Sequence, residues 1–242
     1  MQRTYGQSAT RRRLDAQREK LDALEPDAAI TAIQPTHDEL GRVHFCVKKD
    51  RFGPVHPRDY ETLDLTIGSV LDDDARDQLF FAIATEAART DALRLLGARS
   101  RARQDLLKRL IARGHHKSTA GAAIERLEAV GLIDDAAFAQ DKAAHFVRAK
   151  KLGPRAAGAK LRALGLDASL VTRAIDDAFA GLDLTEQATG AARKRLRALP
   201  PTLDMPTKKR RLYAFLIRRG YDHSTCAQAT QTALLANEPD LA

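Results

Sequence analysis

One short signal recurs three times along the chain and limits what the chain can fold into. A leucine is followed four residues later by a glycine at Leu110–Gly114, Leu161–Gly165 and Leu216–Gly220. A glycine after an apolar helical stretch predicts a left-handed residue that ends the helix. The copies lie about 50 residues apart, which is typical of a repeated unit built from a few short helices. We therefore expect tandem helical repeats.

The second copy carries the fullest set of helix signals, over residues 131–166. Asp134 stands just before an apolar stripe that begins at Phe138, which predicts an aspartate N-cap closed by a hydrophobic staple. Gly153 and Pro154 end this helix and start the next, because proline is tolerated at the first helical position. The segment predicts three short helices joined by tight turns.

The other helix starts are predicted from similar residues. Asp167 and Asp222 follow the glycines of the second and third copies and are the expected N-caps there. His116 takes the equivalent place in the first copy, so that either His116 or Ser118 starts the helix. Further upstream, Ser100 is the expected cap of the helix that ends at the first copy's glycine.

The segment 131–166 resembles the central repeat of the RecX family of recombinase regulators. The similarity rests on three motifs in order, Gly131-Leu-Ile-Asp-Asp-x-x-Phe-Ala139, Lys150-x-x-Gly-Pro154 and Leu161-x-x-x-Gly-Leu166. The resemblance implies tandem three-helix repeats in an elongated, curved, mainly α-helical protein. It also implies a non-enzymatic regulator that binds the RecA recombinase filament on single-stranded DNA. Such a regulator inhibits the ATPase, strand exchange and coprotease activities of the filament.

The N-terminal part has a different pattern. Residues 1–28 are highly charged with only a thin stripe of leucines, and we expect a mobile arm there. Beyond it, Val43, Phe45 and Val47 alternate with polar or small residues, which predicts a small antiparallel hairpin or three-stranded sheet. So small a sheet is marginal alone, and we expect it to dock on the first repeat. Some RecX-family members carry a similar extension.

The predicted fold class is therefore mainly α, with tandem three-helix repeats preceded by a small β-containing extension. The expected parts are a mobile arm (1–28), a hairpin or sheet extension (29–71) and three-helix repeats at 72–133, 134–182 and 183–242.

Composition points to an acidic partner and away from membranes. The formal net charge is +8, which favours binding to nucleic acid or to an acidic protein surface. No apolar run approaches the ~20 residues that a membrane span needs, and no signal-peptide core precedes the charged segment. Cys46 and Cys226 lie far apart and are expected to be reduced thiols. These features indicate a cytoplasmic protein, expected to be a monomer.

We find no motif that predicts catalysis, a cofactor or a metal site. His115 and His116 have no cysteine or carboxylate nearby at metal-ligand spacing, and both are expected to be exposed turn residues. The run from Gly114 to Ser118 lacks the glycine order and the preceding strand of a phosphate-binding loop. Catalytic, cofactor and metal-ligating residues are therefore all predicted to be absent.

What remains is a series of basic positions spread over the repeats, which we predict to form the partner-binding face. A positive stripe of this kind steers association and contacts phosphates or carboxylates. The candidate residues are Lys108, Arg109, Arg113, Lys150, Lys151, Arg155, Lys160, Arg162, Arg210, Arg211, Arg218 and Arg219.

Two alternative functions stay open from the residues alone. Helix pairs joined by short turns also occur in autonomous DNA-binding or transcriptional regulators of the helix–turn–helix class. A structural adaptor could use the same basic face to bind some other acidic protein. Dependence on a recombinase separates the RecX-like function from both, and DNA contact is expected either directly or through the filament.

Overall fold

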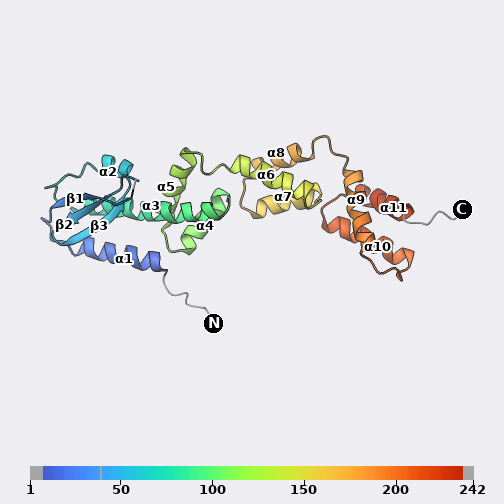
Figure 1. The fold of residues 1–242 in the computed structure, drawn as a ribbon, viewed down its shortest axis with the longest axis horizontal. Coiled ribbons are helices and arrows are strands. Elements are labelled where there is room, and N and C mark those ends of the chain that lie inside the picture. Colours follow the sequence, from blue (N-terminus) through green and yellow to red (C-terminus); the bar gives the residue numbers. More distant parts are fainter. Residues whose placement is uncertain (1–7, 39, 237–242) are drawn as a thin grey trace. The chain divides into compact units, whose positions relative to one another are not determined.

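The computed structural model describes residues 8–38 and 40–236. Over these ranges the chain forms eleven α-helices and one three-stranded sheet near the N-terminus, so the predicted mainly α class with a small β extension is confirmed (Figure 1). The chain divides into two compact units, residues 1–133 and 134–242. None of the helices in the described ranges is long and apolar enough to cross a membrane.

The sheet of the first unit is antiparallel, with the strand order β1-β2-β3. Its register places Phe45 opposite both Ile33 and Phe52, and side chains opposite each other share one face of a sheet. Phe45 and Phe52 are fully buried on that face, so the predicted alternation is confirmed. The strands are β1 (Ala32–Pro35), β2 (Val43–Val47) and β3 (Asp50–Val55).

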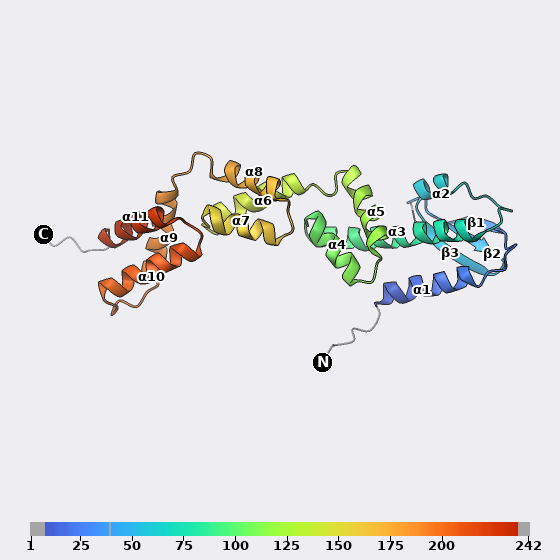
Figure 2. The same ribbon diagram turned by 180° about the vertical axis from the view of Figure 1, so that it is seen from behind.

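The charged N-terminal segment is a packed helix, α1 (Ala9–Asp22), so the predicted mobile arm is wrong for this stretch. Leu14 and Leu21 are buried in the same core as the sheet. The Gln17 amide donates to the Gly53 carbonyl oxygen (3.1 Å) and accepts from the Gly53 N–H (2.9 Å). Both views show α1 alongside β3 and α3 (Figures 1 and 2). The first seven residues of the expected arm lie outside the described part of the chain.

The long helix α3 (Asp73–Ala98) connects the sheet to the first set of repeat helices. Leu79 and Ile83, in its first half, belong to the core that the sheet and α1 share. Ala92 and Leu95, in its second half, belong to a separate core with the next helices. One helix thus serves two cores, and the sheet docks on it. The other helices of this unit are α2 (Pro57–Leu63), α4 (Arg103–Ala112) and α5 (Lys117–Ala129).

The second unit contains two further sets of three helices. Contacts join α6 to α7 and α8, and they join α9 to α10 and α11. The helices are α6 (Asp135–Arg148), α7 (Pro154–Ala163), α8 (Ala168–Phe179), α9 (Leu184–Arg197), α10 (Met205–Arg218) and α11 (His223–Leu235).

The repeated leucine and glycine positions have the same roles in all three copies. Leu110, Leu161 and Leu216 are each fully buried. The glycine that follows each of them has a φ of +95°, +84° or +85°, in chain order. A residue with a side chain is disfavoured there, and the predicted left-handed helix ends are confirmed.

Most predicted helix starts are confirmed, and one is wrong. The side chains of Asp134, Asp167, Asp222 and His116 each accept a hydrogen bond from a backbone N–H in the first turn of the helix that follows. Ser100, in contrast, does not cap α4, because that helix begins after Ala102 without a side-chain cap. The preceding segment is held by the buried Arg101, which donates to the Leu95 carbonyl oxygen at 3.2 Å and to Asp105 at 3.0 Å.

Within the second unit, the α6–α7 loop docks on the α10–α11 turn through backbone atoms. The Gly153 N–H donates to the Arg219 carbonyl oxygen at 2.8 Å. The Tyr221 hydroxyl donates to the Lys151 carbonyl oxygen at 3.1 Å, and burial raises the pKa of Tyr221 to about 12. The phenol therefore stays protonated and keeps donating at neutral pH. Gly220 lies so close to α7 that an added Cβ would overlap the backbone nitrogen of Ala156.

Replacing Leu21 with alanine tests the packing of α1. Leu21 is fully buried, so we expect Leu21→Ala to lower the free energy of unfolding by about 2–5 kcal/mol. Glu19→Ala on the exposed side of the same helix should stay within about 0.5 kcal/mol of the parent. Urea unfolding monitored by circular dichroism measures both values. Equal stabilities of the two variants would mean that α1 does not pack.

The docking of the loop on the turn is tested with a matched pair of glycine variants. Gly220 and Gly181 both have positive φ, so alanine is strained at either position. Only at Gly220 would the new methyl group overlap another backbone segment. If that overlap costs about 1–3 kcal/mol, Gly220→Ala should melt at least about 2 °C below Gly181→Ala. Differential scanning calorimetry checks this difference, and indistinguishable melting temperatures would contradict the close contact.

Candidate functional site

The buried carboxylates of the first unit are neutralised by arginines and hold elements together. Glu86 of α3 has a fully buried side chain, and it accepts from Arg42 at 3.0 Å and from Arg89 at 2.7 Å. The Asp59 carboxylate of α2 accepts hydrogen bonds from both terminal nitrogens of the Arg126 guanidinium, and this pair links α2 to α5. Both carboxylates are thus occupied by guanidinium partners that join elements of the fold, and in the described part of the chain neither stands beside a second carboxylate as a general acid–base pair would.

The buried His115 corrects a sequence prediction. It is 3 % exposed rather than an exposed turn residue, and its Nε2 lies 2.9 Å from the Asp91 carboxylate. Asp91 also accepts from Thr10 of α1 at 3.2 Å and from Arg94 at 3.1 Å. The histidine therefore joins the α4–α5 turn to α3 and, through the carboxylate, to α1. His116 is exposed, as predicted.

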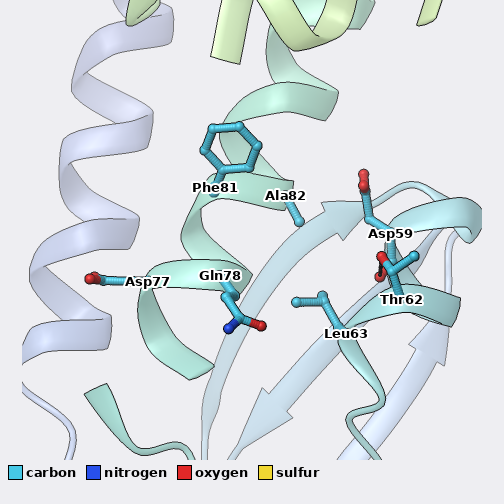
Figure 3. A pocket seen from close by; sticks show the side chains of 7 residues that line it. All are labelled: Asp59, Thr62, Leu63, Asp77, Gln78, Phe81 and Ala82. Atoms are coloured by element: carbon cyan, nitrogen blue, oxygen red, sulfur yellow. Dashed lines mark hydrogen bonds between the residues drawn. The ribbon is translucent and has the colours of Figure 1, made fainter. Parts of the chain in front are cut away.

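A pocket of 510 Å³ lies between α2 and α3, and Figure 3 shows its lining. Leu63, Phe81 and Ala82 give it an apolar wall. Its two carboxylates, Asp59 and Asp77, are paired with Arg126 and Arg18 respectively. The Thr62 hydroxyl in this lining donates to the backbone carbonyl oxygens of Arg58 and Asp59 rather than to a base, so the pocket shows no activated nucleophile.

The described residues include no metal-ligand cluster, and the buried one of the two cysteines is an unreactive thiol. Among residues 8–38 and 40–236, no three His, Cys, Asp or Glu side chains are grouped so that they could hold a metal ion. Cys46 and Cys226 are free thiols. Burial raises the pKa of the Cys226 thiol to about 11, which keeps it protonated and unreactive at neutral pH.

Most of the twelve predicted basic residues are exposed, but they occupy different parts of the chain. Three belong to the first unit, where Lys108 and Arg113 are exposed and the Arg109 Nε donates to Asp105 at 2.9 Å. The other exposed members lie on α7, in the loop before it, or on α10. They are Lys150, Lys151, Arg155, Lys160, Arg162, Arg210, Arg211 and Arg218.

Three of the predicted residues are brought together in the second unit. Arg219, at the end of α10, donates to the backbone carbonyl oxygens of Lys150 and Lys151, the latter at 3.2 Å. The same guanidinium lies over the ring of Phe215, 4.7 Å from its centroid, in a cation–π contact. Because its partners are carbonyls and a ring rather than a carboxylate, Arg219 keeps its positive charge available.

These residues line a groove of 760 Å³, called the repeat groove from here on. Its walls are the end of α6, the α6–α7 loop, one face of α9 and the end of α10. The floor includes the buried Val147 and Ala191 and the half-buried Phe215, whereas Asp183 and Glu186 stand at the α9 start. The basic residues of the lining are Arg148, Lys150, Lys151, Lys194, Arg195 and Arg219.

Four residues of the repeat groove were missed from the sequence, namely Arg148, Lys194, Arg195 and Phe215. The sequence already shows Arg195 within a group of bases on α9. The structure adds that its guanidinium lies 5.9 Å from the Phe215 ring centroid. A signal for this face exists, because residues three and four apart share one side of a helix. That side of α9 combines two bases with mostly small residues. Its members are Gln187, Gly190, Ala191, Lys194, Arg195 and Ala198.

An apolar floor with a basic rim suits an acidic protein surface that offers an apolar side chain. The floor contributes buried area, while the exposed bases raise the rate of encounter with a negative partner. Phe215 with its two flanking arginines has the composition of an interface hot spot, in which aromatic and arginine side chains predominate.

Comparison with known proteins gives consistent results. The family model described as RecX, third three-helix domain, matches residues 183–230. The regulatory protein RecX of Chlorobaculum tepidum is 37 % identical over 143 residues, covering 59 % of this chain and 86 % of the relative. The regulatory protein RecX of Mycolicibacterium vanbaalenii is 41 % identical over 165 residues, covering 63 % of this chain and 85 % of the relative.

Two solved structures share the fold. A crystal structure of a regulatory protein RecX aligns with a TM-score of 0.67 and 21 % identity, covering 84 % of this chain and 99 % of the other. RecX from Lactobacillus salivarius aligns with a TM-score of 0.52 and 18 % identity, over 63 % of this chain and 97 % of the other. Because curated relatives above 35 % identity match over most of their own length, this chain belongs to the RecX family of regulatory proteins.

Proposed function

We propose that this protein binds the RecA recombinase filament on single-stranded DNA and inhibits its ATPase, strand exchange and coprotease activities. Membership of the RecX family carries the proposal, because the match to curated relatives extends over 85 % or more of their length. The protein would act in the cytoplasm as a monomer, without a cofactor and without catalysing a reaction itself.

The repeat groove is the proposed contact with the recombinase. Its floor can take an apolar side chain from the partner, and its rim can pair with carboxylates on either side. The predicted basic residues on α7 and α10 would extend this contact, and those on α4 would add a second one from the first unit.

Several repeats on one chain suggest how binding becomes inhibition. Once one contact is made, a second contact to a neighbouring subunit becomes intramolecular and gains from a high effective concentration. A protein that holds two neighbouring subunits obstructs the incoming duplex and the conformational cycle that ATP hydrolysis requires. The regulator therefore acts by occupying the filament rather than by chemistry.

The proposal predicts that this protein, at less than one molecule per recombinase, lowers ATP hydrolysis by recombinase on single-stranded DNA. A coupled ATPase assay measures the rate with and without the protein. The protein alone should hydrolyse no ATP, because it lacks a phosphate-binding loop. Unchanged recombinase ATPase at saturating protein, together with tight binding to a specific duplex, would instead favour the transcriptional alternative.

The role of the repeat groove is tested with two double charge reversals. Lys150→Glu with Lys194→Glu changes two exposed bases of the rim, whereas Arg173→Glu with Arg193→Glu changes two exposed bases outside it. Both variants lose the same net charge. We expect the rim variant to bind filaments about tenfold more slowly at low salt, with a smaller salt dependence, while the control stays near the parent.

Surface plasmon resonance on immobilised filaments measures the association rates, and the ATPase assay measures inhibition. Circular dichroism melts should show both variants folded, since none of the four residues belongs to a buried core. Equal loss of inhibition in the two variants would show that net charge, and not the repeat groove, controls binding.

A further inference from the structure

A second concave surface lies in the first unit, between α1 and the strands β2 and β3. We call it the α1–sheet groove. It has a volume of 460 Å³ and is lined by Arg13, Ala16, Gln17, Lys20, His44, Arg51 and Gly53. Every ionisable side chain in this lining is a base. None of these residues belongs to the predicted partner-binding set, so this surface is distinct from the repeat groove.

The positive charge of the α1–sheet groove is only partly neutralised. Lys20 is paired with Asp50 at 2.9 Å, but over the described ranges no carboxylate pairs with Arg13 or Arg51. The Arg51 guanidinium instead donates to Nδ1 of His44 at 2.9 Å, which requires that nitrogen to be unprotonated. Two exposed guanidinium groups thus face one hollow, and neither is ion-paired with a carboxylate in the described part of the chain.

The electrostatics of His44 agree with this geometry. Burial, followed by the charges of Arg51, Arg13 and Arg42, lowers the pKa of His44 to about 4, and Asp38 opposes this only weakly. The imidazole is therefore neutral at neutral pH and remains an acceptor for Arg51. A bound anion would reverse the sign of the local potential and raise the pKa of His44.

The walls of the groove are held in place by backbone contacts. Gln17 clamps α1 to β3 through its two hydrogen bonds to Gly53. Gly53 has a φ of +133°, and an added Cβ would stand 3.1 Å from the His44 ring and 3.1 Å from the Val43 carbonyl oxygen. A larger residue would crowd the groove at this point, so the glycine keeps it open.

We propose that the α1–sheet groove binds the phosphate backbone of a nucleic-acid strand. Arginine forks match phosphate oxygens, and such contacts are made in any base sequence. Arg13 and Lys20 lie two turns apart on α1, about 10 Å along its axis, so the basic lining is longer than a single phosphate group. The site is therefore suited to a polyanion rather than to a single small anion.

An acidic peptide fits this surface less well than a nucleic acid. Ala16 is the largest apolar side chain of the lining, so the groove offers no pocket for an apolar anchor. The repeat groove, with Phe215 and Val147 in its floor, does offer one. The proposal does not rest on recombinase binding, because the strand would be bound by this protein alone.

The test uses the full chain without recombinase and a fluorescent single-stranded oligonucleotide of about 20 thymidines. Arg13→Glu with Arg51→Glu removes the two unpaired bases, and Arg58→Glu with Lys117→Glu removes two exposed bases elsewhere in the same unit. Fluorescence anisotropy gives the affinity across a salt series. Each lost phosphate contact lowers the slope of log affinity against log salt by about 0.7 for single strands.

We therefore expect the groove variant to bind at least about tenfold more weakly near 0.1 M salt, with a slope smaller by about 1.4, while the control keeps the parental slope. Equal slopes in the two variants would overturn the proposal. The proposal would also be overturned if a polyglutamate peptide displaced the labelled strand as effectively as unlabelled oligonucleotide does, because the groove would then bind carboxylates. If the charge reversals lower the melting temperature, Arg13→Gln with Arg51→Gln replaces them.

A second readout follows the site directly in the parent protein. The chemical shifts of the carbon-bound protons of the His44 imidazole are followed by NMR as a function of pH, with and without saturating oligonucleotide. Phosphates in the α1–sheet groove should raise the pKa of His44, and the exposed His116 serves as the reference ring. An unchanged His44 pKa in the presence of bound oligonucleotide would place the strand elsewhere on the protein and overturn the proposal.

Discussion

The repeat groove depends on one close backbone contact, between Gly220 and Ala156 in the second unit. This approach lets the α6–α7 loop hydrogen-bond to the end of α10, so the Arg219 side chain reaches carbonyl oxygens of the loop. A side chain on residue 220 would separate the two segments. Arg219 is therefore positioned by peptide carbonyls and an aromatic ring, and no carboxylate among the described residues is ion-paired with it.

The two grooves differ in the groups that surround their bases, and this difference separates their proposed ligands. In the repeat groove, arginines lie over the ring of Phe215 beside buried aliphatic side chains, as in protein interfaces. In the α1–sheet groove, arginines face a neutral histidine and a glutamine, with no large apolar side chain. Burial of apolar area can add to affinity only in the first, whereas affinity in the second must come from charge and depends strongly on salt.

Local signals in the sequence were sufficient for most helix ends of the repeats, but not for the packing of α1 or for the sites. An aspartate such as Asp134 caps within its own turn, and a glycine such as Gly165 ends its own helix, so neighbouring residues determine both. The contacts that build the sites connect distant residues: His115 meets Asp91 across 24 positions, Gln17 meets Gly53 across 36, and Arg219 meets Lys150 across 69. Exposure of a base can be predicted from helical periodicity, but which bases meet depends on how the helices pack.

The same long-range contacts make α1 part of the first unit rather than an appendage. At one end, Asp91 accepts from Thr10 and from His115, which connects the helix to the first repeat. Further along, Gln17 connects it to the sheet, and Leu21 enters the core that α3 shares with the strands. Because these contacts already hold the α1 helix in place, binding a strand has to order the exposed Arg13 side chain but not the helix that carries it. The helix that was expected to be mobile is thus a preorganised wall of the α1–sheet groove.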